Sequence, residues 1–156
     1  MDGTRKVAYP YARLKGLEEF MAFLQAPEWK PSKIDAALLK KLDVAKSKER
    51  ETVHALEFLG IVNDDGAPTQ EFDQLKADYR TTLRRLVLDK YRDLFDLIPP
   101  ALVNQTRLVR FFGLSADTAE YQAKLFAWFC EQAGIDLPNL EKHFHRARFD
   151  KENNKN

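Results

Sequence analysis

A cluster of basic residues lies between two predicted helices, and side chains of this type bind phosphate groups. Lysine and arginine supply many of the contacts that proteins make with the sugar-phosphate backbone of DNA. The free N–H groups and the dipole at the start of a helix add positive charge to such a site. The pattern therefore predicts DNA contact by Lys40, Lys41, Lys46, Lys48, Arg50 and His54.

The cluster leads into the third predicted helix, over residues 47–59. In a helix-turn-helix protein, a helix in this position lies in the major groove of DNA. Arg50 and His54 are four residues apart, so both lie on the outward face of this helix. The alternative interpretation is a charged turn that contacts only water, and Glu51 and Glu57 on the same helix favour that alternative.

Two further amphipathic segments precede the third helix. Apolar residues recur every three or four positions over residues 12–25 and 32–42, which is typical of helices with one buried face. Ser32 and Ser47 occupy the positions of N-caps for the second and third helices. These three helices must position the basic cluster.

A tight turn follows the third helix. Asp65 and Gly66 form a strong turn signal between the short apolar segments 61–62 and 67–68. Pro68 restricts the second strand to a sheet edge, so the predicted β-hairpin wing is very short. The order of helix, turn and hairpin is typical of a winged-helix protein.

The predicted wing carries acidic residues, although a wing that enters a minor groove normally carries arginine or lysine. Residues 63–65 are Asn-Asp-Asp, which would repel phosphate. This feature favours a protein partner, or DNA contact by the helix alone.

The remainder of the chain predicts further helices. One helix begins at Thr69, and one long helix covers residues 78–97. Two more helices begin at Asn104 and at Ser115. The predicted fold class is mainly α, with a winged-helix-like N-terminal module packed on a C-terminal helical module. The predicted boundaries are 9–76 for the first module, 77–135 for the second, and 136–156 for a short helix and disordered tail.

The C-terminal tail interleaves basic and aromatic residues, a pattern that can clamp single-stranded nucleic acid. A weak nucleic-acid contact is predicted for Lys142, His145, Arg146 and Arg148. The alternative, which the sequence favours, is a short helix whose apolar residues dock on the body of the protein and leave the charges in water.

Composition and the remaining motifs limit the function classes. The net charge of +1 excludes a protein that coats nucleic acid by bulk electrostatics, so any basic patch must be local. Cys130 is the single cysteine and lies among apolar residues, which favours a buried structural thiol over a nucleophile. No enzyme signature, metal site, cofactor, small-molecule substrate or membrane span is predicted, and a cytoplasmic location is expected.

Several motifs, in this order and spacing, resemble a prokaryotic family catalogued as domain of unknown function five-three-four-three. The resemblance covers roughly residues 9–135 and implies a mostly helical bacterial or archaeal protein, without carrying over any catalytic residue. The motifs are Pro10-Tyr11, the helix that reaches Leu39 and Leu42, residues 55–62, residues 65–69, residues 91–95, and residues 113–115.

Two functions are consistent with these features. The first is a non-catalytic, winged-helix-type DNA-binding protein with a regulatory or accessory role. The second is a protein-interaction adaptor in a bacterial assembly, such as a defence or mobile-element system. The adaptor would dock through exposed aromatic residues, for which the sequence offers Trp29, Tyr9, Tyr11 and Trp128.

Overall fold

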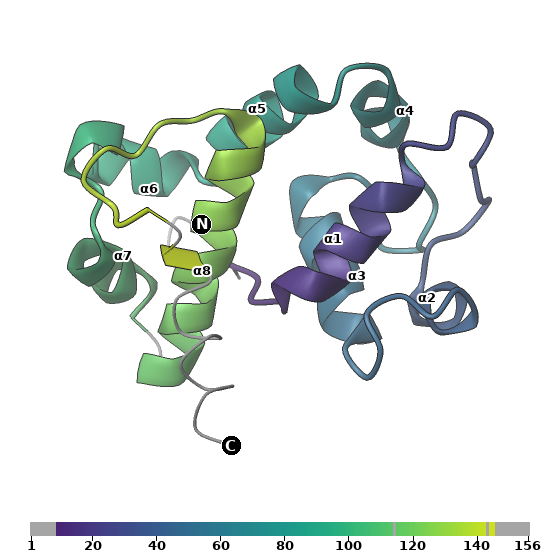
Figure 1. Cartoon of the computed structure of the whole chain (residues 1–156), viewed down its shortest axis with the longest axis horizontal. Coiled ribbons are helices and arrows are strands. Elements are labelled where there is room, and N and C mark those ends of the chain that lie inside the picture. Colours follow the sequence, from purple (N-terminus) through teal and green to yellow (C-terminus); the bar gives the residue numbers. More distant parts are fainter. Residues whose placement is uncertain (1–8, 114, 143, 146–156) are drawn as a thin grey trace, which may run out of the picture.

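The computed structural model describes residues 9–113, 115–142 and 144–145, and this part of the chain is mainly helical (Figure 1). The described residues contain no β-strand. The elements are α1 (Leu14–Phe23), α2 (Ala36–Lys41), α3 (Glu49–Leu59), α4 (Gln70–Ala77), α5 (Tyr79–Lys90), α6 (Arg92–Leu97), the 3-10 helix η1 (Pro100–Leu102), α7 (Gln105–Phe112) and α8 (Ala116–Ala133).

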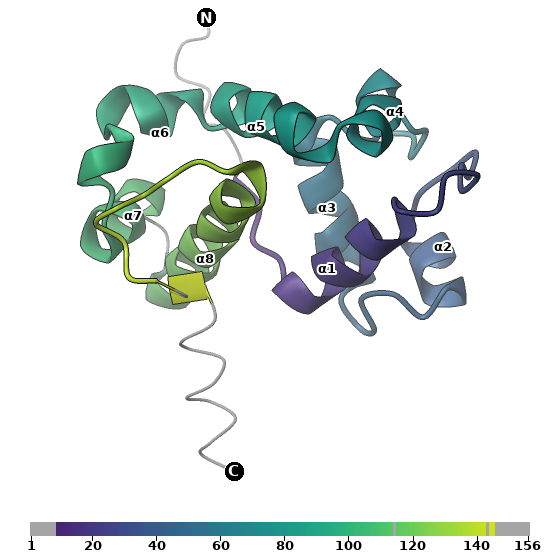
Figure 2. The ribbon, with the colours of Figure 1, turned by 45° about the horizontal axis from the view of Figure 1, so that its top comes forward.

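The helices form two groups, α1 to α4 on one side and α6 to α8 on the other, with α5 running along the top between them (Figures 1 and 2). Helix α5 packs on α3 and α4 in the first group and on α8 in the second. The buried apolar side chains form one cluster that includes residues of both groups. The predicted module boundary at residues 76 and 77 falls in the last turn of α4, just before α5, and the division into two modules stays a prediction.

Tyr91 bends the helix that the sequence predicts as continuous over residues 78–97. The chain forms α5 and α6 instead, with Tyr91 between them at φ −103° and ψ 26°. Backbone hydrogen bonds continue across the bend, from Tyr91 N to Val87 O (3.0 Å) and from Phe95 N to Tyr91 O (3.1 Å). The Tyr91 ring is fully buried against Phe58 and Phe126, so tertiary packing outweighs the regular continuation of the helix.

An extended segment before α1 joins the two groups of helices. The Tyr9 ring lies 5.8 Å from the ring of Phe58 in α3, stacks on Tyr91 at 5.5 Å and packs edge-on against Phe112 in α7 at 5.4 Å, measured between centroids. The side chain of Gln122 in α8 donates to the Tyr9 carbonyl at 3.0 Å. The start of the described chain is therefore fixed to both groups, and its path beside α8 towards α1 is visible in Figure 2.

The sequence predicts a β-hairpin wing after α3, and this prediction is wrong for the described residues. A single antiparallel bridge between Val62 and Pro68 takes the place of two strands. Pro68 has no N–H to donate, and the next residue, Thr69, is already the N-cap of α4. The N–H of Ala67 donates to the side chain of Asn63 (3.0 Å). A ladder of backbone hydrogen bonds consequently has no room to extend.

Some of the predicted helix starts are confirmed and others are wrong. Thr69, Asn104 and Ser115 accept hydrogen bonds from backbone N–H groups in the first turns of α4, α7 and α8, which confirms these three caps. The predicted caps Ser32 and Ser47 are wrong. Asp35 caps α2 by accepting from Leu38 N at 2.9 Å, and the backbone of Ser47 is left-handed, ahead of the helix.

Gly16 lets α1 approach the connection between α2 and α3. A Cβ atom at Gly16 would lie 2.7 Å from both the Cβ of Ala45 and the Oγ1 of Thr52. We expect Gly16→Ala to lower the free energy of unfolding by about 1–2 kcal/mol, because overpacking outweighs the gain in helix propensity. Chemical denaturation measures the change. Adding Ala45→Gly should recover part of the loss, and an unchanged or higher stability of Gly16→Ala would contradict this packing.

Candidate nucleic-acid interface

The connection between α2 and α3 has a strained but anchored backbone. Three of its non-glycine residues are left-handed: Asp43 (φ 59°), Ala45 (φ 58°) and Ser47 (φ 67°). Such residues cost roughly 1–2 kcal/mol each. Val44 and Ala45 are buried, and the N–H of Ala45 donates to the carboxylate of Glu19 in α1 at 2.8 Å. The packing therefore holds a conformation that the chain alone disfavours, and such strain gathers at functional sites.

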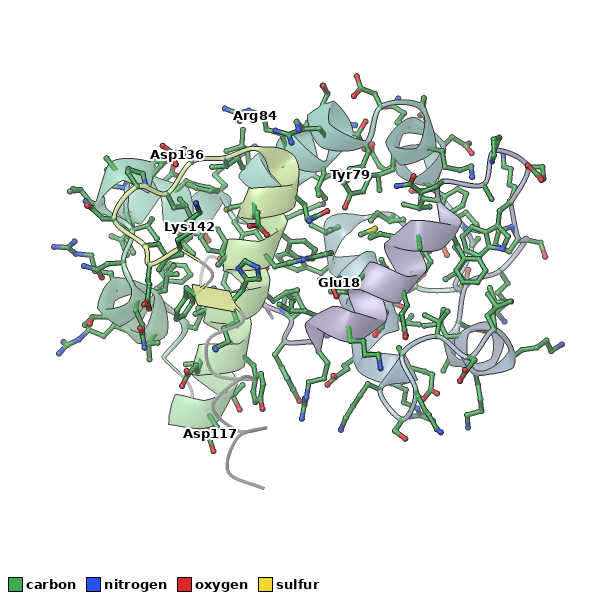
Figure 3. The ribbon with its side chains drawn as sticks, viewed as in Figure 1. Glu18, Tyr79, Arg84, Asp117, Asp136 and Lys142 are labelled. Atoms are coloured by element: carbon green, nitrogen blue, oxygen red, sulfur yellow. The ribbon has the colours of Figure 1, made fainter. Side chains whose placement is uncertain are left out.

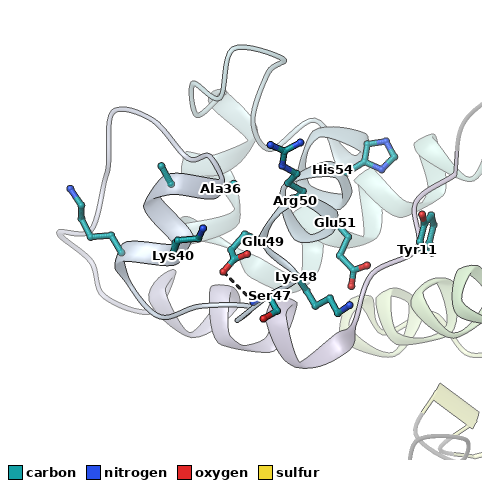
Figure 4. Close-up of a pocket in the computed structure, with 11 residues that line it drawn as sticks. Tyr11, Ala36, Lys40, Ser47, Lys48, Glu49, Arg50, Glu51 and His54 are labelled. Carbon is teal, nitrogen blue, oxygen red and sulfur yellow. Dashed lines mark hydrogen bonds between the residues drawn. The ribbon is translucent and has the colours of Figure 1, made fainter.

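An open groove of about 1040 Å³ lies between α2 and α3, beside this connection (Figure 4). We call it the cationic groove. Its lining comes from α2, from the end of the connection, from the start of α3, and from the extended segment before α1. The lining residues are Tyr11, Ala36, Ala37, Lys40, Lys41, Ser47, Lys48, Glu49, Arg50, Glu51 and His54.

The structure brings five of the six predicted DNA-contact residues together in this groove. Lys46 does not line it and lies exposed in the connection. The four permanent cations of the groove form no ion pair with any other described residue. These cations are Lys40, Lys41, Lys48 and Arg50.

Two carboxylates also line the groove, but both accept hydrogen bonds from the protein. Glu49 Oε2 accepts from the N–H of Ser47 at 3.2 Å (dashed in Figure 4). Glu51 Oε1 accepts from the N–H of Arg13 at 3.0 Å, and its Oε2 lies 3.4 Å from the Arg13 guanidinium. The Glu51 side chain is only 17% exposed. The negative charge of Glu51 is therefore largely compensated within the protein.

Arg13 connects the groove to the second group of helices. Its guanidinium lies over the ring of Tyr121 in α8, at 4.6 Å from the centroid, while it pairs with Glu51 in α3. No sequence pattern marks Arg13 as a site residue. Because 38 positions separate it from Glu51, no local pattern could reveal the pair.

The described tail residues, Lys142 and His145, lie away from the groove. Lys142 is exposed beside α8, on the side opposite to α2 and α3 (Figures 1 and 3). His145 is buried, with its Nε2 3.2 Å from Glu131 Oε1 of α8. Arg146 and Arg148 lie outside the described residues. Of the two described tail residues, only Lys142 presents its charge to solvent.

The aromatic residues suggested for protein docking are mostly inside the fold. Trp128 is 1% exposed, so its predicted exposure is wrong. The physical reason is that α5 and α7 both pack on α8, and residues 122–130 of α8 are all buried. Trp29 packs against Phe23 at 5.0 Å between ring centroids. Tyr11 is 44% exposed, and it lines the cationic groove.

Cys130, in α8, lies in the hydrophobic core and is 1% exposed. Burial raises the pKa of its thiol far above the usual value, which keeps it protonated. The buried structural thiol that the sequence predicts agrees with this environment. A thiol in this state is not a nucleophile.

Across residues 9–113, 115–142 and 144–145, no three or more His, Cys, Asp or Glu side chains are grouped so as to hold a metal ion. Within the same described residues, no helix has both the length and the apolar character needed to cross a bilayer.

The fold and the groove define a mainly helical protein with an exposed cationic groove between its second and third helices. A family model described as "Family of unknown function (DUF5343)" matches residues 10–135. The chain therefore belongs to this family, as its sequence motifs indicate. No curated protein and no solved structure matched the chain.

Proposed function

We propose that this protein is a non-catalytic DNA-binding protein, with a regulatory or accessory role, that holds duplex DNA in the cationic groove. The observation that carries the proposal is the set of four permanent cations in one groove, none paired with another described residue. Two of these cations, Lys48 and Arg50, lie at the start of α3, where the helix dipole adds to their charge and favours phosphate binding.

The arrangement of α1, α2 and α3 supports a helix-turn-helix type of contact. Helix α3 has 11 residues, which corresponds to about 16 Å, long enough to lie across a major groove of about 12 Å. Arg50 and His54 are exposed and four residues apart on α3. In this proposal His54 reaches a base edge, while Lys40, Lys41, Lys48 and Arg50 contact phosphates.

The acidic loop that replaces the wing is not required for this contact. Residues 63–65 are exposed, but none of them lines the cationic groove. The N–H of Ile34 donates to the carbonyl of Gly66 at 2.7 Å, which fixes the loop beside the start of α2. We therefore propose a winged-helix-like contact made by helices alone, without a β-wing.

Titration with random-sequence duplex DNA over a range of salt concentrations tests the proposal. Four phosphate contacts predict a slope of about −3.6 for the logarithm of the association constant against that of salt concentration. Fluorescence anisotropy of a labelled duplex measures this slope. An absence of binding at low salt, or binding that does not weaken with salt, would overturn the proposal.

Arg13 is predicted to support DNA binding without touching DNA. Arg13→Ala should weaken duplex binding about fivefold, because the unpaired Glu51 carboxylate would then add about 1 kcal/mol of repulsion to the groove. The double variant Arg13→Ala/Glu51→Gln has the wild-type net charge and should recover the lost affinity. Thermal melts of both variants monitor the fold. Equal affinities of the single and double variants would show that Arg13 acts through structure rather than charge.

A second candidate function is the protein-interaction adaptor. The observation that favours it is an exposed apolar surface at the end of α6 and in η1, where Leu97 is 70% and Leu102 is 50% exposed. If the duplex titration fails, Leu97→Asp offers the corresponding test. Loss of a partner captured by the wild-type protein would support the adaptor, and unchanged capture would reject this surface.

A further inference from the structure

Tyr11 is an exposed aromatic residue held at one end of the cationic groove. Its ring has no ring contact with any other described aromatic residue, and its side chain lines the groove with Lys48, Arg50 and His54 (Figure 4). With 44% of the residue exposed, the ring is only partly packed against the fold. The position therefore points to a planar ligand group.

The backbone around Tyr11 is firmly anchored, although the side chain is exposed. Pro10 and Ala12 are both buried. On one side the Tyr9 carbonyl accepts from Gln122 (3.0 Å), and on the other the N–H of Arg13 donates to Glu51 (3.0 Å). The backbone therefore holds Tyr11 in a fixed position, so that little backbone conformational freedom is lost when a ligand binds.

In duplex DNA, stacking covers the faces of the bases, whereas an unpaired base exposes a face. Aromatic side chains stack on unpaired bases with little preference for sequence, and cationic neighbours hold the adjoining phosphates. Tyr11 and the cations of the groove provide these two elements together. We infer that the groove prefers duplex DNA that ends in a single-stranded overhang, with Tyr11 stacking on an unpaired base. This inference rests on the proposed DNA binding.

The test compares two duplexes of equal length, one blunt and one with a short single-stranded overhang. The readout is the ratio of their dissociation constants. For the wild-type protein we expect a preference of about tenfold for the overhang, within the range that stacking of one base supplies. A fluorescent base analogue in the overhang should also be quenched on binding.

Variants of Tyr11 identify the origin of the preference. Tyr11→Phe keeps the ring and should keep the ratio, whereas Tyr11→Ala should bring the ratio close to one. Leu88→Ala is a matched control, because it removes an exposed apolar side chain outside the groove and should leave the ratio unchanged. A wild-type ratio of one, or an equal loss in Tyr11→Phe and Tyr11→Ala, would overturn the inference. Failure to bind either duplex would instead reject the proposed function.

Discussion

Tyr91→Ala is expected to lower the free energy of unfolding by about 3–5 kcal/mol. Tyr91 is 0% exposed and lies where α5, α6, α8 and the extended N-terminal segment meet. Its ring packs against Tyr9, Phe58 and Phe126, at centroid distances of 5.5, 5.1 and 4.9 Å. Truncation would leave a cavity at this junction and remove every one of these aromatic pairs. Urea denaturation monitored by circular dichroism measures the change.

Tyr91→Phe is the matched control for this prediction. The Tyr91 hydroxyl is buried and has no hydrogen-bond partner among the described residues. Removing an unsatisfied buried hydroxyl while keeping the ring should leave the stability unchanged or raise it by about 1 kcal/mol. If Tyr91→Phe lost as much stability as Tyr91→Ala, the hydroxyl would have to be a structural hydrogen-bond donor. That result would contradict a stabilising role of the ring alone.

Replacing Lys48 and Arg50 together with alanine is expected to weaken duplex binding about 60-fold near 0.1 M salt. Each phosphate contact contributes about eightfold at that concentration, since its effect follows the salt concentration to the power of about 0.9. The salt slope should also become less negative by about 2, as two contacts are lost. Both side chains are exposed, so the fold should be unaffected. Anisotropy titrations of the double variant provide both quantities.

A second double variant controls for net charge. Lys30 and Arg92 are exposed, lie outside the cationic groove, and pair with Asp73 and Asp89, respectively. Replacing both with alanine removes the same charge from the protein but should change duplex affinity by no more than about twofold, because distant surface charges are screened. Equal losses in the two double variants would indicate attraction by net charge, without a specific site.

The basic groove was predictable from the sequence because its parts are close in the chain. Lysine and arginine residues at the end of one amphipathic helix and the start of the next must lie near each other in space. The helix ends were also largely local: Gly60, Gly113 and Gly134 are left-handed C-caps, as glycine at these positions indicates. Local sequence patterns therefore predicted most of the secondary structure, and five of the six predicted contact residues line the groove.

The features that the sequence did not reveal depend on distant contacts. The bend at Tyr91 follows from ring packing with α3 and α8, and the regular apolar spacing of residues 78–97 conceals it. The burial of Trp128 depends on the packing of α5 and α7 on α8, which the sequence pattern around Trp128 does not show. The absence of a β-hairpin from the described residues has a local cause, since Pro68 and the cap at Thr69 leave no residue free to extend a strand.

The inert state of Cys130 makes this protein convenient for site-specific labelling. Maleimide dyes react with thiolates that they can reach, and the only native cysteine is neither ionised nor accessible. A cysteine introduced at an exposed position, such as Ala37 beside the groove, would consequently carry a single dye without any change to α8. The distance from that dye to a labelled oligonucleotide would then give the orientation of the bound strand.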